Sequence, residues 1–399
     1  MNVRHVRTCR SCGGTDLRPV LDLGNLAISD FLLPDQIPDR APLALIRCDD
    51  CTLVQLSCTV ERERLYTSYH YRSGINPAMV GALADVVRDA RSHVTLHPGD
   101  AVLDIGCKEA QLLANDAGEP LHRIGFDPSD VARHAWLLSD FSYDLIRDYF
   151  PTTRQHSPEL CKIITAIACF YDVDDPNQFL AEVKRWLHPK GVLVLQFQDL
   201  ASMCATTAID NICHEHLTYW SQSALLPLFH RHGLRLRDSG YHPINGGSMR
   251  LTLQHEMGVP QDYTIGSPDM SVFVDRVKRN RAEVRRFLEG IPYGERVYGI
   301  GASTKFNTLS QWYHVGPEQI VAIGDRDPRK VGKRTVTGIP IISEEDMRAA
   351  KPAWLLCGAW QWADQFAERE YDVLAGGTKM IVPLPDLRII DRVAARQGV

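Results

Sequence analysis

Short apolar runs alternate with amphipathic stretches over most of the chain, and this pattern predicts strands separated by helices. Strands spaced by helices imply βαβ units and a mostly parallel sheet that helices cover on both faces. Two more runs follow later and predict two strands joined by a loop. From about residue 73 to residue 257 the runs fall at 101–107, 123–127, 162–168 and 192–197, and then at 234–236 and 249–253.

A second set of the same units follows a polar connecting segment. Residues 268–290 are rich in charge and predict a solvated connecting helix. After it, residues 297–305 read as a strand, a glycine turn and the start of a helix. The runs 320–323 and 354–357 predict two more strands. The pattern therefore predicts an α/β protein with two sets of βαβ units.

The first seventy residues differ from the rest and carry a cysteine motif. Two Cys-x-x-Cys pairs, Cys9 with Cys12 and Cys48 with Cys51, stand 35 residues apart. Four thiolates in this arrangement suit a closed, tetrahedral zinc site. A segment of this size has little core of its own, so we expect the zinc to be structural. The alternative is four ordinary cysteines without a metal.

The composition is that of a globular protein with a slight excess of acidic groups. The chain has 399 residues, enough for two or three domains, and a formal charge of −5. This charge argues against a strongly basic surface for nucleic acid. No apolar run approaches 18 residues and no signal peptide is evident. We therefore expect no nucleic-acid or membrane partner, a cytoplasmic location and reduced cysteines.

Acidic residues at two predicted strand ends indicate a nucleoside cofactor. The turn Asp104-Ile105-Gly106-Cys107 ends the first strand, and Asp127 stands at the tip of the next. Open α/β sheets bind ligands at such ends, where a carboxylate can accept hydrogen bonds from ribose hydroxyls. NAD and S-adenosylmethionine both fit. No G-x-G-x-x-G pyrophosphate loop is present here, which favours S-adenosylmethionine, although glycine turns of this kind are also common without a ligand.

The densest cluster of titratable side chains is Cys213-His214-Glu215-His216. Two imidazoles beside a carboxylate provide a base near neutral pH and a partner to orient it. The spacing differs from that of an H-E-x-x-H zinc helix, so a catalytic metal is not expected here. A hydrogen-bonded loop without chemistry is the alternative.

Three other segments could contact a substrate, and each could equally serve packing alone. One is a polar turn before a late strand, one is a glycine turn whose backbone N–H groups could cradle a phosphate, and one is an aromatic cluster. In that order they are Asn245-Gly246-Gly247-Ser248, the turn of Gly299 and Gly301 with Ser303 and Lys305, and Tyr69, Tyr71, Arg72 and Ser73.

At these motifs the chain resembles the nucleotide-sugar C-methyltransferases that make branched deoxysugars. The resemblance covers essentially all 399 residues, with the motifs in the same order. Besides the cysteine pairs, the motifs are Y-x-Y-x-S at 69–73, D-I-G-C at 104–107, G-x-D-P at 125–128, H-E-H at 214–216, G-G-S-x-R at 246–250, G-x-G-A-x-x-K with a later asparagine at 299–307, D-R-x-P-x-K at 325–330 and G-I-P-I-I at 338–342.

The resemblance implies a fold of three domains. These are a small N-terminal zinc-binding domain (1–72), a central Rossmann-like class I methyltransferase domain (73–257) and a C-terminal Rossmann-like α/β domain (258–399). The central domain would bind S-adenosylmethionine, and the C-terminal domain would help to hold the nucleotide of a 4-keto-deoxysugar. The implied reaction is methylation of a carbon next to the ketone through an enolate. Which nucleotide, which carbon and whether the chain is a monomer or a dimer stay open.

The resemblance also implies roles for single residues. His216 would remove the proton, Glu215 and His214 would orient it or bind the sugar, and Tyr71 would close the pocket. Asp172 takes the position of a family histidine implicated in catalysis. The residues implied at the cofactor are Asp104, Gly106, Cys107, Asp127 and Pro128. Those implied at the substrate are Asn245, Gly246, Gly247, Ser248, Gly301, Ser303, Lys305 and Asn307.

Several positions depart from the family pattern. The asparagine, aspartate and glycine that usually follow D-I-G-C are Lys108, Glu109 and Ala110, the tyrosine before H-E-H is Cys213, and the histidine before G-G-S is Asn245. The usual N-V-F-A-H segment runs from Ala168 to Asp172 and lacks its asparagine and histidine. Two alternatives therefore stay open: a ketosugar epimerase, isomerase or other enolate-using enzyme with a degenerate S-adenosylmethionine site, or a non-enzymatic sugar-nucleotide-binding protein.

Overall fold

The computed structural model describes residues 2–66, 74, 77–152, 158–256 and 266–391, so the predicted Tyr71 lies outside the described residues. The chain forms two compact units, each built from several segments. The first comprises Met1–Pro19, Leu45–Ser202 and Glu215–Pro268, and the second comprises Val20–Ala44, Met203–His214 and Asp269–Val399.

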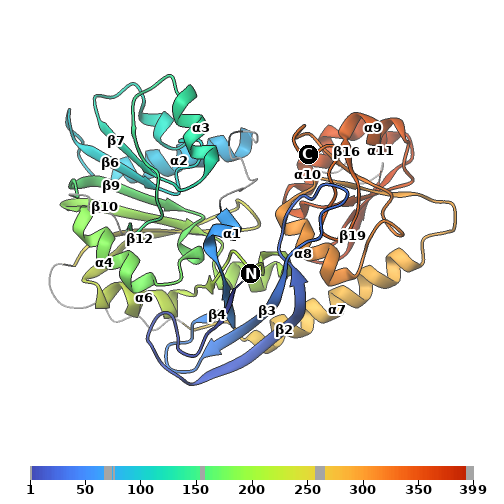
Figure 1. The fold of residues 1–399 in the computed structure, drawn as a ribbon, viewed down its shortest axis with the longest axis horizontal. Coiled ribbons are helices and arrows are strands. Elements are labelled where there is room, and N and C mark those ends of the chain that lie inside the picture. The colour runs from blue at the N-terminus through green and yellow to red at the C-terminus, as the bar shows by residue number, and fades with distance from the viewer. Residues whose placement is uncertain (1, 67–73, 75–76, 153–157, 257–265, 392–399) are drawn as a thin grey trace. The chain divides into compact units, whose positions relative to one another are not determined.

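The first unit contains the predicted, mostly parallel sheet. Its strand order is β12-β13-β10-β9-β6-β7-β8, and β13 runs antiparallel to both neighbours. The chain moves from β6 outward to β7 and β8, then returns to β9 on the other side of β6 (Figure 1). The strands are β6 (Ala101–Ile105), β7 (His122–Phe126), β8 (Asp144–Ile146), β9 (Cys161–Ile167), β10 (Leu187–Phe197), β12 (Leu234–His242) and β13 (Ser248–His255).

Alternating side chains on the central strands give this sheet two apolar faces. Val102 and Ile163 pack with α2, whereas their neighbours Leu103 and Ile164 pack with α4 and α6 on the other face. Both faces are therefore covered, as the sequence predicts, and the strands can be apolar throughout. The helices are α1 (Arg62–Tyr66), α2 (Pro77–Ser92), α3 (Asp130–Leu138), α4 (Pro176–Trp186), α5 (Leu200–Ala205), whose last three residues lie in the second unit, and α6 (Gln222–Arg231).

The four predicted zinc ligands come together in the first unit. The Sγ atoms of Cys9, Cys12, Cys48 and Cys51 all lie within 4.8 Å of one another. The Cys9–Cys51 distance is 3.5 Å and the Cys12–Cys48 distance is 3.6 Å. Four sulfurs bound to one tetrahedral zinc would be about 3.8 Å apart, whereas disulfide sulfurs would be about 2.0 Å apart. The spacing therefore fits zinc and not disulfides.

Each of the two cysteine pairs is followed by a turn of the same kind. The amide of Gly13 donates to the Cys9 carbonyl and that of Thr52 to the Cys48 carbonyl, each at 2.9 Å. Both residues are left-handed, with φ of +77° at Gly13 and +65° at Thr52. A β-branched residue rarely adopts this conformation, so Thr52 occupies a position in the cysteine turn where glycine would be expected.

The cysteine cluster is joined to two small sheets and to the central domain. β1 (Val3–His5) pairs with β5 (Cys58–Val60), and the order of the other sheet is β11-β4-β3-β2. Arg10 stands between the ligands Cys9 and Cys12 in the sequence. Its guanidinium is buried, and its Nε lies 3.0 Å from the Asp174 carboxylate. The strands of the second small sheet are β2 (Leu17–Ala27), β3 (Arg40–Cys48), β4 (Val54–Leu56) and β11 (Thr218–Tyr219).

The second unit holds a second parallel sheet, with the order β16-β15-β14-β17-β18-β19 and only β19 antiparallel to its neighbour. β15 begins at Ile323, later than the predicted run at 320–323. The strands are β14 (Val297–Ile300), β15 (Ile323–Asp325), β16 (Ile341–Ser343), β17 (Trp354–Cys357), β18 (Lys379–Val382) and β19 (Arg388–Ile390). The helices are α7 (Met270–Glu289), α8 (Thr304–Tyr313), α9 (Glu344–Ala349), α10 (Ala363–Arg369) and α11 (Tyr371–Ala375).

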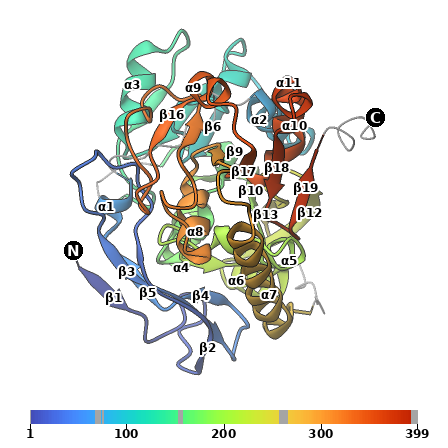
Figure 2. The same ribbon diagram turned by 90° about the vertical axis from the view of Figure 1, so that its right-hand side faces the viewer.

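The helix predicted at 268–290 is not simply solvated. α7, which Figure 2 shows in front of this unit, buries Phe273, Val277 and Val284 along one side. Asn280 on the same side donates to the Pro383 carbonyl at 2.7 Å. Charged residues lie between these positions, so the apolar stripe is hard to recognise in the sequence. α7 is therefore an amphipathic helix that packs on its own unit.

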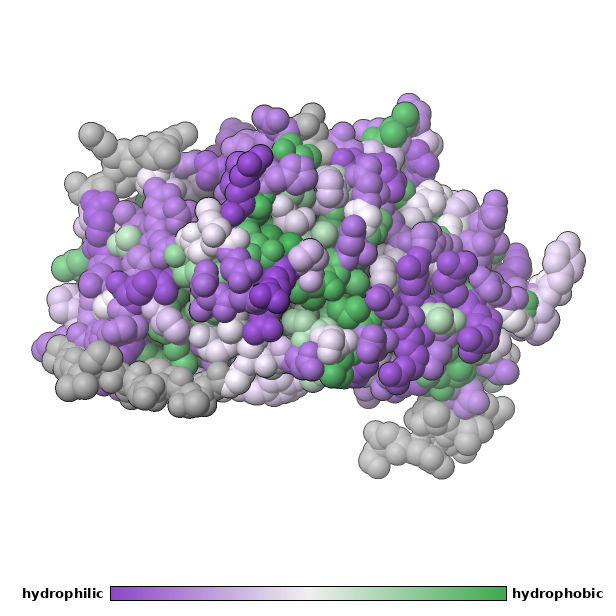
Figure 3. Space-filling view, turned by 90° about the horizontal axis from the view of Figure 1, so that it is seen from below, coloured by the Kyte–Doolittle hydropathy of each residue, from purple (hydrophilic) through white to green (hydrophobic). Residues whose placement is uncertain are grey.

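Among the described residues, no helix combines the length and the apolar character needed to cross a bilayer. Hydrophilic residues also predominate on the face drawn in Figure 3.

We expect the Cys48→Ser variant to lose its zinc and to unfold at a lower temperature. Removal of one thiolate opens a four-ligand site, and the binding free energy of a structural zinc is part of the folding free energy. Elemental analysis should fall from about one zinc per chain to well below half, alongside a drop in the thermal midpoint. Cys58→Ser is the matched control, because Cys58 is a buried cysteine on β5 outside the cluster. A wild-type protein without zinc would contradict the assignment.

Candidate active site

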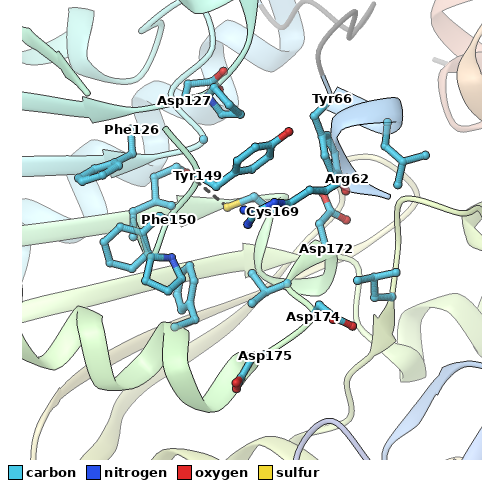
Figure 4. A pocket seen from close by; sticks show the side chains of 18 of the residues that line it. Arg62, Tyr66, Phe126, Asp127, Tyr149, Phe150, Cys169, Asp172, Asp174 and Asp175 are labelled. Carbon is cyan, nitrogen blue, oxygen red and sulfur yellow. Dashed lines mark hydrogen bonds between the residues drawn. The ribbon is translucent and has the colours of Figure 1, made fainter. Parts of the chain in front are cut away.

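A pocket of about 890 Å³ opens at the carboxyl ends of β6, β7 and β9 (Figure 4). This is the point where the strand order reverses, and such points are the usual ligand sites of open α/β sheets. The volume lies in the range of pockets that hold cofactor-sized molecules. The residues that line it include Gly106, Lys108, Asp127, Pro128, Cys169 and Asp172.

Gly106 brings the backbone to the pocket wall after β6. Its φ is +77°, and a Cβ atom built there would lie 3.4 Å from the Cys169 Cβ. Its amide donates to the Phe126 carbonyl at 2.8 Å, which ties the turn to the end of β7. A side chain at this position would be strained and would narrow the pocket beside Cys169.

Asp127 is fixed at the tip of β7 with its carboxylate at the pocket. The amide of Lys108 donates to Oδ2 at 3.0 Å, and the amide of Ser129 donates to Oδ1 at 2.9 Å. The Ser129 hydroxyl also donates to Oδ1. A carboxylate has about four acceptor positions, so these bonds orient the group and leave capacity for a hydroxyl donor of a ligand.

Two of the predicted cofactor residues lie behind the pocket wall. The Asp104 carboxyl is buried and accepts a 2.7 Å hydrogen bond from Thr165, and burial raises the pKa of Asp104 to about 7. Cys107 is also buried, and its Sγ would lie 2.6 Å from a Cβ atom built on Gly125. The sequence brings Gly106, Asp127 and Pro128 to the cavity, whereas Asp104 and Cys107 support it from behind.

The departures after Cys107 do not fill the pocket. Lys108 and Ala110 have φ of +46° and +54°, so the backbone keeps the left-handed shape that glycine would favour. Ala110 is 1% exposed and packs in the cluster that contains Leu83 of α2. A left-handed alanine costs about 1 kcal/mol, and its buried methyl group offsets part of that. Only Lys108 of this segment lines the pocket.

The H-E-H motif is divided between the two units. His214 belongs to the second unit, is buried, and has its Nε2 3.1 Å from the Ala41 carbonyl. Burial lowers the pKa of His214, so its imidazole is neutral. Glu215 and His216 belong to the first unit. His214 thus has a structural hydrogen bond of its own.

Glu215 and His216 meet the segment that follows β9. The His216 ring lies 4.2 Å from the Tyr171 ring, centroid to centroid. The Tyr66 hydroxyl donates to the Glu215 carbonyl at 3.2 Å. The neighbours Asp172 and Leu217 line the pocket, so Tyr171 and His216 stand beside its wall. The motif and the segment at 168–172 therefore come together, as the resemblance implies.

The polar turn at 245–248 has a left-handed backbone and is bonded within the first unit. Asn245, Gly246 and Gly247 all have positive φ, of +55°, +88° and +103°. Gln198 donates to the Gly246 carbonyl and Ser248 to the Ile244 carbonyl, each at 3.1 Å. None of these four predicted substrate residues is among the lining residues of the pocket described above.

Arg250, the last residue of the same motif, has a structural place. It is buried on β13, donates to Gln196 at 2.7 Å and lies 2.9 Å from Asp85 of α2. These bonds hold α2 on the sheet.

The second unit has a glycine turn of its own after β14. Gly301 has φ of +83°, and a Cβ atom built on Gly358 would lie 2.4 Å from its carbonyl oxygen. Ser303 caps α8, accepting from the Phe306 amide at 3.0 Å and donating to the Gly358 carbonyl at 3.1 Å. Asn307 is buried and donates to the Asp30 carbonyl at 2.9 Å, so it secures the chain around this turn.

The structure adds residues that the sequence reading missed. Near Lys305 lies the buried Asp210, which accepts a 2.9 Å hydrogen bond from the Trp360 indole. In the first unit, Tyr149 and Tyr66 line the pocket, and Arg62 lies 4.0 Å above the Tyr149 ring. Tyr149 follows the three-residue strand β8 and Tyr66 is the last residue of the five-residue helix α1, and in neither segment does periodicity or a charge pattern mark a site.

Comparison with known proteins agrees with this arrangement. Three family models match consecutive parts of the chain: "Putative zinc binding domain" at residues 9–66, "Methyltransferase domain" at 80–239 and "C-methyltransferase C-terminal domain" at 243–385. The C-methyltransferase NovU of Streptomyces niveus is 27% identical over 419 residues, which cover 97% of this chain and 98% of the relative.

Solved structures align with part of the chain at low scores. An S-adenosylmethionine-dependent methyltransferase from Clostridium acetobutylicum has a TM-score of 0.36 and 10% identity, over 45% of this chain and 92% of that one. The YcgJ protein from Bacillus subtilis has a TM-score of 0.36 and 12% identity, over 45% and 99%. Scores this low carry no conclusion of their own. The three family models and the relative that matches almost end to end do: the chain is an S-adenosylmethionine-dependent methyltransferase with a zinc-binding domain, a methyltransferase domain and a C-methyltransferase C-terminal domain.

Proposed function

We propose that this protein methylates a carbon next to the ketone of a nucleotide-linked 4-keto-deoxysugar, through an enolate that a base of the protein generates. The observation that carries the proposal is the pocket at the ends of β6, β7 and β9, with the Asp127 carboxylate on its wall and the H-E-H segment beside it. When bound, S-adenosylmethionine supplies an electrophilic methyl group. The remaining chemistry falls to side chains of this chain.

Asp127 and Gly106 bind the cofactor in this proposal. The Asp127 carboxylate is already oriented by the amides of Lys108 and Ser129, so it can accept the ribose hydroxyls without rearranging. Gly106 leaves room for the ligand beside the turn, and Pro128 lines the same wall. Asp104 and Cys107 act through packing behind this wall.

His216 is the base that we assign. A hydrogen on a carbon beside a ketone is acidic because the resulting charge spreads onto the carbonyl oxygen, and an imidazole can accept it near neutral pH. The Tyr171 ring lies against the imidazole and limits its orientation. Glu215 stands next to it in the chain. His214, with its own bond to Ala41, supports the loop instead of touching substrate.

The second unit would hold the nucleotide of the substrate. Its turn at Gly301 presents backbone amides at the start of α8, and Lys305 adds a positive charge one turn into that helix. The buried Asp210 and Trp360 lie in the same unit, and the carboxyl of Asp210 interacts with the Lys305 charge. A dinucleotide is less suited to this turn, because Thr304 takes the third glycine position of the G-x-G-x-x-G pattern.

The function is tested directly with a 4-keto-deoxysugar nucleotide and S-adenosylmethionine. Mass spectrometry should show a gain of one CH₂, and incubation in deuterated water without the methyl donor should show deuterium at the carbon beside the ketone. Exchange without any methyl gain would favour an epimerase or isomerase on the same scaffold. Neither signal, with binding of the sugar nucleotide alone, would favour the non-enzymatic alternative.

We expect His216→Ala to lower the exchange rate by at least about a hundredfold, because a positioned base contributes about 10²–10⁴-fold. His230→Ala is the matched control, since His230 is an exposed histidine on α6 that pairs with Glu256 at 3.0 Å. Binding of the sugar nucleotide should persist in both variants. Unchanged exchange in His216→Ala would remove this residue from the role of base.

We expect Asp127→Ala to weaken S-adenosylmethionine binding by roughly 10- to 100-fold, because hydrogen bonds to a charged group contribute about 1.5–3 kcal/mol. Calorimetric titration measures this. Asp130→Ala is the control, because Asp130 is three residues away on α3, and its exposed carboxylate pairs with Arg147. Equal affinities of wild type and Asp127→Ala would show that the ribose is held elsewhere.

A further inference from the structure

Two aspartates on one wall of the pocket have opposite surroundings. Asp174 pairs with Arg10 at 3.0 Å and with Arg4, and these charges lower the pKa of its carboxyl, which is therefore an anion. Asp172, two residues earlier, closes the short turn after β9 and has no arginine beside it among the described residues. Figure 4 shows both residues at the same pocket.

Asp172 has one carboxyl oxygen without a bonding partner. Its Oδ1 is buried and makes no hydrogen bond to any of the described residues. Its surroundings are the Glu215 carboxylate, the Lys108 ammonium and the Tyr66 hydroxyl. An unpaired carboxylate in such a place would be costly, because burial penalises the charge and the nearby Glu215 repels it.

The same surroundings determine the protonation state. Burial and the Glu215 charge raise the pKa of Asp172 well above its ordinary value, and the opposing effects of Lys108 and Tyr66 are smaller. These effects favour the protonated form, a carboxylic acid with an O–H to donate, at the wall of a pocket that has room for a ligand.

We propose that Asp172 acts as a neutral acid that donates a hydrogen bond to the ketone oxygen of the substrate and so stabilises the enolate. The inference rests on the function proposed above and adds the group that stabilises the negative charge developing on the ketone oxygen. It makes Asp172 a catalytic residue, distinct in role from the base His216.

The step balances with these two groups. The C–H bond beside the ketone breaks, its proton goes to the His216 imidazole, and its electron pair forms the C=C bond while the carbonyl π electrons move to oxygen. The Asp172 O–H stays covalently intact and strengthens its hydrogen bond as charge builds on that oxygen. When the enolate carbon takes the methyl group, the C–S bond of the donor breaks with its electron pair on sulfur, the C=O bond re-forms, and the imidazolium returns its proton to water.

The test compares two substitutions of the same residue in the deuterium-exchange assay. Asp172→Ala removes the donor, and we expect exchange to slow by roughly 10²–10³-fold, the usual effect of losing one donor to an oxyanion. Asp172→Asn keeps an N–H donor of similar shape that cannot ionise, and we expect it to stay within about tenfold of wild type. Thermal midpoints and S-adenosylmethionine affinity should differ little between the two variants.

The dependence on pH gives a second readout. In wild type, the donor form of Asp172 exists below its raised pKa and is lost as the pH rises through it, so exchange should fall at high pH. Asp172→Asn should lack this fall. Asp174→Asn is the matched control, because that carboxylate is already ionised; it should lower stability and leave the shape of the pH profile unchanged.

The outcomes separate the two proposals. If Asp172→Asn is as slow as Asp172→Ala, or if Asp172→Ala exchanges at the wild-type rate, the donor role is wrong. A high-pH fall that persists in Asp172→Asn overturns it as well. If wild type itself gives neither exchange nor a methylated product, the proposed function fails, and that result is recognisable because it does not depend on residue 172.

Discussion

The return of the chain from β8 to β9, across β6, is the constraint on which the functional site depends. β7 and β9 lie on opposite sides of β6, so the loops at their carboxyl ends run apart. The space between those loops cannot be filled by backbone. The turns at Gly106 and at Ala168 both end there with positive φ, and Asp127 arrives from the third strand. The pocket is thus a product of strand order, and single side chains only shape it.

This explains why much of the fold could be predicted while much of the site could not. Apolar runs mark β6, β7, β9 and β10 because central strands are buried on both faces, and the paired cysteines mark the metal site because two Cys-x-x-Cys pairs are typical of a four-thiolate zinc site. Short elements such as β8 and α1 carry no such signal. The pocket residues Tyr149, which follows β8, and Tyr66, which ends α1, were therefore missed.

Motif resemblance predicted which segments meet, and it could not predict which way each side chain points. His214 and Asn307 belong to matching motifs, yet the side chain of each forms a hydrogen bond with a backbone carbonyl of its own unit. Ala110 shows the converse: a lost glycine changed neither the left-handed backbone nor the opening, because the added methyl group turns into the core. Orientation depends on neighbours distant in sequence, and a single motif does not contain them.

The Arg10–Asp174 contact ties the metal centre to the chemistry. Arg10 stands between two cysteine ligands in the sequence and pairs with the Asp174 carboxylate. Asp174 lines the pocket, two residues from Asp172. A preparation stripped of its metal by a chelator would therefore release that wall and look like an inactive enzyme, even with every reacting group intact. Metal content belongs among the first quantities to measure in any batch that fails to turn over.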